Sequence, residues 1–280
     1  MLGAIGPRPI AFASTINQAG QVNLAPFSFF NAFGANPPIL IFSPARSGRT
    51  NTNKDTFNNV KEVPEVVINV VSYDMVQQMS LSSCEFPPNV NEFVKAGFSE
   101  QPSVKVRPPR VLQSKVQIEC KVNEVIETGD QGGAGNLVIC EILMMHIDEQ
   151  VLDENGKIDL RKLDLVGRMG GNVYCRANGE ALFEVNKPGA KQGIGFDGLP
   201  PDVLTSSILT GNDLGILAGV EQLPDSEAIS IFSQQDDFRS WVARFVNDPD
   251  GFNHQKHMKA RQLIAQSNVE DAWLTLLAKL

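Results

Sequence analysis

The sequence predicts a mainly β domain followed by a helical extension. From Pro9 to about Ile147, short β-type segments alternate with Gly, Asn, Asp and Pro, which is typical of an antiparallel barrel or sandwich. Beyond Phe183 comes a stretch rich in Gly and Pro, after which apolar residues recur at helical spacing. We therefore expect two domains, at residues 1–185 and 186–280, with the second packed on the first.

Five segments show the clearest strand pattern: residues 10–15, 39–43, 66–72, 116–126 and 137–147. A turn at residues 17–20 follows the first segment, and a Gly-rich run at 129–135 joins the last two. We expect a hairpin at each of these places. The pair Asn155-Gly156 predicts a third tight turn, because both residues tolerate positive φ.

Helical spacing appears first at residues 54–63, where Phe57, Val60 and Val63 recur every third position and Pro64 ends the pattern. Residues 73–80 predict a second short helix. The extension contains four predicted helices, at residues 212–220, 237–246, 254–266 and 269–279.

Composition excludes several classes of protein. A net charge of −8 with a pI near 5.0 argues against nucleic acid or an anionic membrane as the main partner. The four cysteines form no CxxC pair, which argues against a zinc site and fits reduced thiols. No run approaches the roughly 18 apolar residues of a membrane span. We therefore expect a cytoplasmic protein without a metal site.

Residues 193–198 match the pattern GxGxxG, but their context argues against a dinucleotide fold. That motif follows a strand and opens a helix, whereas Lys187-Pro188 precedes this one and Pro200-Pro201 follows it. We interpret the segment as a loop. His254 and His257 have no third ligand nearby in sequence, and GxSxG is absent, so no catalytic side chain is predicted.

Residues 23–33 have an unusual composition for a plain core strand. Four phenylalanines alternate with Asn23, Ser28 and Asn31, and Pro26 interrupts the backbone hydrogen-bond ladder. One interpretation is a bulged barrel strand with a helical turn. The other is a wall for a flat heteroaromatic ring, with amides meeting its polar edge and aromatic side chains excluding water. The residues alone leave both open.

Several spaced motifs between Pro7 and Tyr174 resemble the flavin reductase domain family, which includes flavoredoxin-like proteins and reductase components of two-component monooxygenases. They are PRPIAF-ST, NLAPFSFFNAF, NPP, KDT-NN and GR-GG-Y. The resemblance implies an FMN-binding split β-barrel, a homodimer with flavin near the interface, and an oxidoreductase that reduces flavin with NADH or NADPH. Electrons would then pass to free flavin, a partner oxygenase or another acceptor.

The resemblance also implies a set of cofactor contacts. These are Ser14 and Thr15 at the phosphoribityl chain, Asn23, Ala25, Pro26 and Ser28 at the isoalloxazine, Phe29, Phe30 and Asn31 closing the wall, Arg46, Lys54, Asp55 and Thr56 at the phosphate, and Arg168 near the ring. A helix start at Lys54 would present free N–H groups and a positive charge to a phosphate, although any helix start can carry Lys and Thr.

Two arginines stay ambiguous. Arg168, followed by Gly170 and Gly171, suits either a contact to the flavin or a tight turn with a surface cation. Arg8 suits a phosphate contact or an ion pair at the barrel rim. Two rival functions also stay open: a non-catalytic flavin-binding electron carrier, and a split-barrel oxidase of a small organic substrate. None of these needs an acid–base pair, because the cofactor supplies the chemistry.

Overall fold

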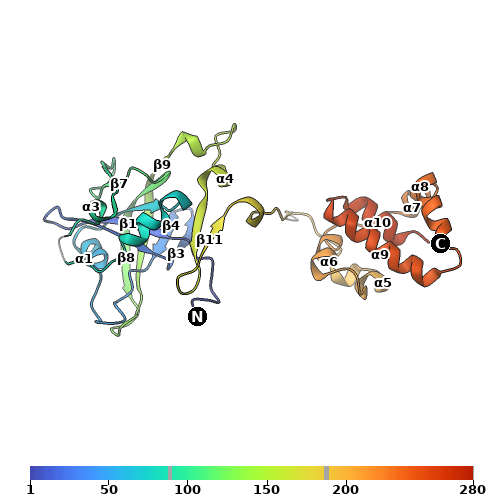
Figure 1. Cartoon of the computed structure of the whole chain (residues 1–280), viewed down its shortest axis with the longest axis horizontal. Helices are drawn as coiled ribbons and strands as arrows, with labels where there is room; N and C mark the ends of the chain where they lie inside the picture. The colour runs from blue at the N-terminus through green and yellow to red at the C-terminus, as the bar shows by residue number, and fades with distance from the viewer. Residues whose placement is uncertain (88–89, 186–188, 280) are drawn as a thin grey trace. The chain divides into compact units, whose positions relative to one another are not determined.

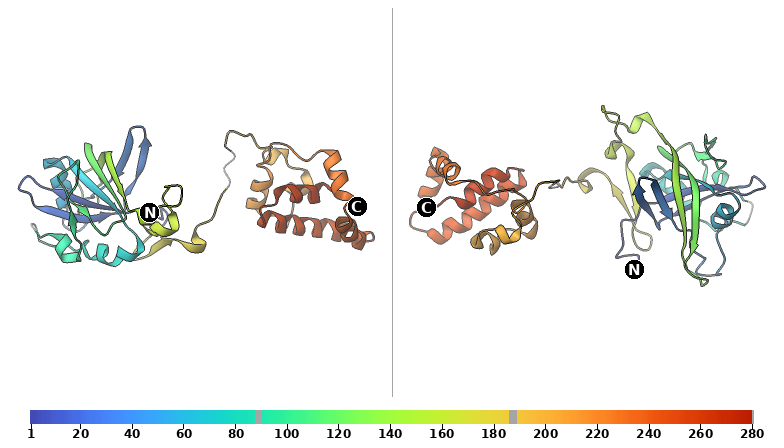
Figure 2. Two further views of the ribbon diagram at one scale, coloured as in Figure 1. Left: turned by 90° about the horizontal axis from the view of Figure 1, so that it is seen from above. Right: turned by 180° about the vertical axis from the view of Figure 1, so that it is seen from behind.

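The computed structural model describes residues 1–87, 90–185 and 189–279, and it divides into two compact units, Met1–Phe183 and Glu184–Leu280. All strands of the described residues belong to the first unit, and the second contains helices (Figures 1 and 2). The predicted start of the second domain, residue 186, lies outside the described residues.

The first unit is built on a seven-stranded antiparallel sheet in the order β2-β1-β5-β8-β9-β4-β3. The predicted mainly β fold is confirmed, and each of the five predicted segments is a strand. The strands are β1 (Ala11–Ile16), β2 (Val22–Phe27), β3 (Phe30–Ala35), β4 (Pro38–Phe42), β5 (Glu65–Val70), β8 (Val116–Glu127) and β9 (Asn136–Ile147).

The sheet curls into an open barrel because its two edges are joined by a very short connection. Strands β2 and β3 are the two edges, yet only Ser28 and Phe29 lie between them in sequence. Three peptide steps reach about 11 Å, whereas the edges of a flat seven-stranded sheet would lie about 29 Å apart. The sheet must therefore bend until β2 and β3 approach each other.

Both faces of the first strands are buried, in two separate clusters. Ala11 and Ala13 of β1 face the cluster inside the curl, while Ile10 and Phe12 face a second cluster outside it. Helix α1 (Asp55–Glu62) contributes Val60 to the inner cluster. The outer cluster is covered by η1 (Tyr73–Met75), α2 (Val76–Leu81) and α3 (Glu92–Ala96). The predicted helices at 54–63 and 73–80 are confirmed.

Short elements complete the first unit. They are β6 (Glu100–Gln101) paired with β7 (Arg110–Val111), η2 (Glu149–Val151), α4 (Leu160–Leu163), β10 (Leu165–Arg168) paired with β11 (Tyr174–Ala177), and η3 (Gly179–Ala181). The turn at Asn155-Gly156 is present, with Gly156 at φ 71°, but it joins a single bridge between Leu152 and Ile158.

The second unit has its own core around the buried Trp273 and Leu217. Its elements are η4 (Phe196–Gly198), α5 (Pro201–Leu204), α6 (Gly211–Leu217), α7 (Ser226–Ser233), α8 (Asp236–Val242), η5 (Ala243–Phe245), α9 (Pro249–Ala265) and α10 (Val269–Leu277). The four predicted helices are confirmed, whereas α5 and α7 were not predicted. In the described part of the chain, no helix has the length and apolarity to cross a membrane.

The GxGxxG segment of the second unit is a packed loop, as predicted. The N–H groups of Ile194 and Gly195 donate to the carbonyls of Val220 and Ala218. A Cβ atom at Gly193 would lie 2.5 Å from the carbonyl oxygen of Ala218, so glycine is required by the close approach of two backbone segments.

Arg8 fastens the end of β10 to the N-terminal segment. The backbones of Arg8 and Arg168 exchange two hydrogen bonds, of 2.9 and 2.8 Å. The buried Arg8 guanidinium also donates to the carbonyls of Leu2 and Met169, at 2.7 and 2.6 Å, and to that of Ile5. Within the described residues, the ion pair expected for Arg8 is therefore wrong, since its guanidinium donates to three carbonyl groups that position Arg168. The alternative phosphate contact stays a prediction.

We expect Arg8→Met to loosen this attachment, because methionine keeps an apolar stem but makes none of the three charge-assisted hydrogen bonds. The free energy of unfolding of the first unit should fall by about 2–4 kcal/mol. Urea unfolding followed by far-UV circular dichroism measures this change. Tryptophan fluorescence should not shift, because both tryptophans, Trp241 and Trp273, lie in the second unit.

The matched control is Arg107→Met, since Arg107 is exposed and its guanidinium makes no ion pair in the described residues. That variant should stay within about 0.5 kcal/mol of the parent protein. An Arg8→Met variant that is equally unaffected would show that the loop after β10 is held without the guanidinium.

Candidate functional site

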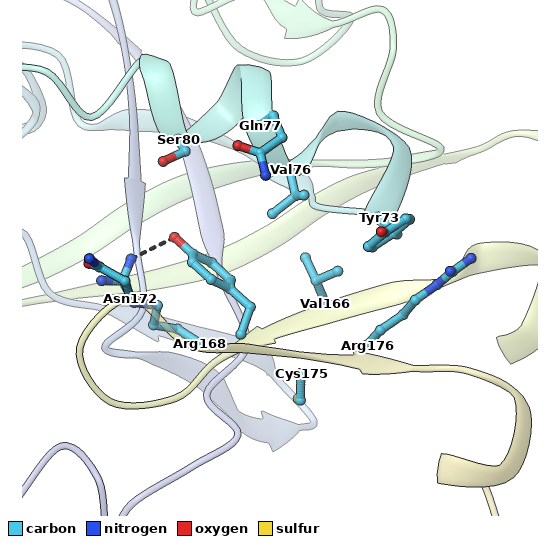
Figure 3. Close-up of a pocket in the computed structure, with 10 residues that line it drawn as sticks. Tyr73, Val76, Gln77, Ser80, Val166, Arg168, Asn172, Cys175 and Arg176 are labelled. Atoms are coloured by element: carbon cyan, nitrogen blue, oxygen red, sulfur yellow. Dashed lines mark hydrogen bonds between the residues drawn. The ribbon is translucent and has the colours of Figure 1, made fainter.

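A cavity of about 320 Å³ lies between α2 and the β10–β11 hairpin. Figure 3 shows Val76, Gln77 and Ser80 on the helical side, facing the strands that bear Arg168 and Arg176. The complete lining is Tyr73, Val76, Gln77, Ser80, Val166, Arg168, Asn172, Tyr174, Cys175 and Arg176. Aromatic, cationic and amide groups thus share one concave surface.

A second cavity of about 80 Å³ adjoins the first. It is lined by Ile10, Pro26, Ser28, Met79, Ser80, Ser83, Arg168 and Tyr174. Because Ser80, Arg168 and Tyr174 line both cavities, the two form one trough that runs along α2. At its narrow end, this trough reaches the β2 edge of the sheet.

The β2 edge is closed at Leu24 and open at Pro26 and Ser28. In the β1–β2 register Pro26 lies opposite Phe12. Because Pro26 has no N–H group, we take this pair as a non-hydrogen-bonded one, so that the backbone groups of Pro26 and of every second residue from it point away from β1. Leu24 is such a residue, and its N–H donates to Glu92 at 3.0 Å. The Pro26 carbonyl and the backbone of Ser28 therefore face the trough side of the edge.

Glu92 is a buried acid beside this edge. Burial raises the pKa of Glu92 above its ordinary value and the nearby Asp55 carboxylate adds to the rise, whereas hydrogen bonds from the N–H groups of Leu24 and of Glu92 itself oppose it. Its carboxyl group is thus held by backbone donors rather than by a cation. This arrangement fixes the start of β2 against α3.

Three cations gather near the start of α1, and we call Arg46, Arg49 and Lys54 the cation cluster. Arg49 and Lys54 share a single carboxylate, Glu85, at 2.7 and 3.4 Å. The Arg49 guanidinium, and then Lys54, hold the pKa of Glu85 below its usual range. Ser83, which lines the small cavity, lies two residues before Glu85, so the carboxylate shared by Arg49 and Lys54 is close in sequence to a residue of the trough.

Arg46 is held by neutral groups only. Its guanidinium donates to the side-chain oxygens of Asn51 and Asn53, both at 2.9 Å, and to the carbonyl of Asn51 at 2.6 Å. Within the described residues, Arg46 forms no salt bridge with a carboxylate. Among the described residues, Glu85 is thus the carboxylate that forms salt bridges with the cation cluster, while Asp55 lies in the first turn of α1.

The start of α1 is positioned by two buried side-chain hydrogen bonds. Asn23 donates to the Thr56 hydroxyl at 2.8 Å, and Asn59 donates to the Thr15 hydroxyl at 3.1 Å. Lys54 is the N-cap residue, and its side chain caps no backbone group. The N–H groups of the first turn thus lack a side-chain cap and give the helix start a partial positive charge.

The structure brings only some of the predicted contacts to the trough. Pro26, Ser28 and Arg168 line it, while Arg46 and Lys54 belong to the cation cluster, with Asp55 and Thr56 at the helix start. The remaining predicted residues do not line either cavity: Ser14, Thr15, Asn23, Ala25, Phe29, Phe30 and Asn31.

Several of the predicted contacts have buried side chains or side chains that are bound within the fold. The side chains of Ser14 and Thr15 are fully enclosed, on opposite faces of β1, and Asn23 is bound to Thr56. Phe30 packs on the inner cluster, and Asn31 is exposed on β3, where its side chain accepts from the Ala32 N–H. These residues shape the surroundings of the trough rather than its surface.

Most residues of the trough were not predicted as cofactor contacts. They include Tyr73, Gln77, Ser80, Ser83 and Arg176. Glu85, the carboxylate that pairs with the cation cluster, was not predicted either. The sequence offers one signal, because the chain has only two tyrosines, Tyr73 and Tyr174. In the structure, both line the larger cavity. Rare, half-exposed aromatic residues often mark binding surfaces.

Comparisons with known proteins agree with this architecture. The family model described as a flavin reductase like domain matches residues 4–163. An uncharacterised protein of Aquifex aeolicus is 39% identical over 185 residues, which cover 66% of this chain and 92% of that protein.

Two solved structures have 30% identity and cover 66% of this chain. Nitrilotriacetate monooxygenase component B from Bacillus cereus matches over 90% of its length with a TM-score of 0.61. The 2-nitrobenzoate 2-nitroreductase of Pseudomonas fluorescens matches over 88% of its length with a TM-score of 0.57. The chain therefore belongs to the flavin reductase like domain family, whose split-barrel members are flavin-related oxidoreductases.

Proposed function

We propose that this protein binds FMN in the trough, accepts hydride from NADH or NADPH, and passes electrons to a separate acceptor. The observation that carries the proposal is that Pro26 and Ser28 of the β2 edge line one small cavity with Arg168 and Tyr174. Ser83 of the same cavity lies two residues before Glu85, the partner of Arg49 and Lys54. FMN needs groups of these kinds, for its phosphate, for the polar rim of its ring and for the charge of the reduced ring.

The cation cluster suits a phosphate because it has an excess of positive charge. Arg46, Arg49 and Lys54 meet only one carboxylate, Glu85, and the adjacent helix start adds its partial charge. A phosphate dianion would replace part of the Glu85 contact and leave the cluster close to neutral. Lys54 is the N-cap of α1 and is placed to meet both the helix start and the anion.

The β2 edge suits the polar rim of a flavin ring. The Pro26 carbonyl and the Ser28 groups face the trough, and Met79 and Ile10 provide an apolar floor that excludes water. Arg168 places a positive charge next to the ring, where negative charge would accumulate on reduction. Bound FMN would supply the hydride chemistry, while these residues orient the ring and stabilise charge.

We expect Lys54→Ala to weaken FMN binding about tenfold while leaving riboflavin binding within about threefold, because riboflavin has no phosphate. Quenching of flavin fluorescence on titration with the protein measures both dissociation constants. Equal loss for the two ligands would exclude Lys54 from the phosphate end.

Helix α1 offers a matched control in Lys61, which lies in its last turn and pairs with Glu127 at 3.2 Å. Lys61→Ala should change neither affinity by more than about twofold, since it lies away from the helix start. Glu85→Gln should act in the opposite direction and strengthen FMN binding, because it frees Arg49 and Lys54 from their carboxylate.

Anaerobic titration with NADH or NADPH separates reductase activity from its rivals. We expect the flavin absorbance of the FMN-loaded protein to bleach, and the yellow colour to return when air is admitted. A protein that binds FMN but keeps its colour with both nucleotides would be an electron carrier or a substrate oxidase instead.

Free flavin and a partner oxygenase are the proposed acceptors, and the proposed location is the cytoplasm.

We also propose a homodimer with the flavin near the interface. An apolar row on β9 supports an interface, since Leu143, Met145 and Ile147 lie on one face with 44%, 46% and 38% of their surface exposed. Sedimentation equilibrium should therefore give twice the chain mass, and Met145→Asp should shift the protein toward monomer. A monomer at micromolar concentration would contradict this assignment.

A further inference from the structure

We propose that the larger cavity is a second ligand site, which takes a monocyclic aromatic carboxylate with Arg168 as its counter-ion. The presence of a flavin beside this acid rests on the proposed function. The cavity, its lining residues and their charges do not depend on that function.

The two arginines of this cavity differ in their partners. Arg176 donates from Nε and from its terminal nitrogen to the two oxygens of Asp164, at 2.8 and 2.7 Å. This guanidinium is the main reason that the pKa of Asp164 lies below its usual range. The charge of Arg176 is thus already matched by a bidentate carboxylate within the fold.

Arg168, in contrast, contacts neutral groups. Its guanidinium donates to the Tyr174 hydroxyl and to the Gly171 carbonyl, both at 2.5 Å, and stacks 4.7 Å from the centre of the Tyr174 ring. Among the residues that the structure describes, it pairs with no carboxylate. Since guanidinium has five N–H donors, it keeps donors for a bidentate carboxylate.

The remaining lining favours a flat, mostly apolar body. Val76 and Val166 face each other across the cavity, and Tyr73 lies beyond them (Figure 3). Gln77, Ser80 and Asn172 add polar groups around the apolar walls. A volume of about 320 Å³ is at the lower end for small-molecule sites, so it suits one substituted ring rather than a dinucleotide.

Cys175 plays no part in the proposed binding. Its side chain points away from the cavity in Figure 3, toward Gly167, where a Cβ atom would lie 3.2 Å from its sulfur. The site is therefore proposed to bind its ligand without a covalent bond.

The two tyrosines make this cavity directly observable. The full chain labelled with 3-fluorotyrosine should give two ¹⁹F resonances, both from the cavity, and Tyr73→Phe assigns them. We expect benzoate to shift the Tyr174 resonance saturably, with a dissociation constant below about 1 mM. Benzamide, a neutral molecule of nearly the same shape, should bind at least tenfold more weakly. This comparison needs no variant of Arg168.

Variants test the assignment of the counter-ion. Arg168→Gln should weaken benzoate binding at least tenfold, whereas Arg176→Gln should weaken it less than threefold, because its charge is matched by Asp164. The loss of benzoate affinity in Arg168→Lys should lie between the losses in the two glutamine variants, because lysine keeps the positive charge but lacks the planar fork of the guanidinium. Retained dispersion of the two ¹⁹F signals and an unchanged melting temperature establish that each variant is folded.

Three results would overturn the proposal: no saturable benzoate shift, benzamide binding as tight as benzoate binding, or equal losses for the Arg168 and Arg176 variants. Repeating the benzoate titration with FMN present tests this proposal separately from the proposed function. If FMN binds and displaces benzoate, the cavity belongs to the flavin and this inference fails while FMN binding stands. If FMN does not bind but benzoate does, the proposed function fails and this site stands.

Discussion

The two-residue connection between β2 and β3 is the constraint on which the site depends. It joins the opposite edges of a seven-stranded sheet, so the sheet has to curl. Pro26 cannot donate a backbone hydrogen bond and therefore suits an edge strand. Glu92 takes the free N–H of Leu24, which leaves the polar backbone at Pro26 and Ser28 as the part of this edge that a ligand can reach.

Charge pairing then decides where anions can bind along the trough. A guanidinium held by a carboxylate offers little to a ligand, whereas one held by carbonyl or hydroxyl groups keeps its charge. Arg176 is of the first kind, and Arg168 and Arg46 are of the second. Position alone would make the two cavity arginines equivalent. Their partners make them different, and only the folded chain reveals those partners.

Sequence patterns predicted the regular elements well, because strands and helices follow from local periodicity. They predicted the site unevenly. Ser14 and Thr15, both predicted at the cofactor, are neighbours on a strand, so their side chains face opposite sides, and the structure buries both. Their contact with a cofactor stays a prediction. Glu85 and Arg176 enter the site through contacts between segments distant in sequence, which no spacing rule reports. The three carbonyl partners of Arg8 could not be predicted, because backbone acceptors give no signal in the residue types of a sequence.

Arg168 links the two proposed ligands, because it lines both cavities with a single positive charge. A carboxylate beside it and negative charge on a reduced ring would compete for that cation. Binding of an acid should then make reduction of the flavin less favourable, and reduction should weaken acid binding by the same factor. Arg8 supports this coupling indirectly, because it fastens the backbone from which Arg168 projects. If both proposed ligands bind, one guanidinium, positioned by another, would connect occupancy of the larger cavity with reduction of the flavin in the smaller one.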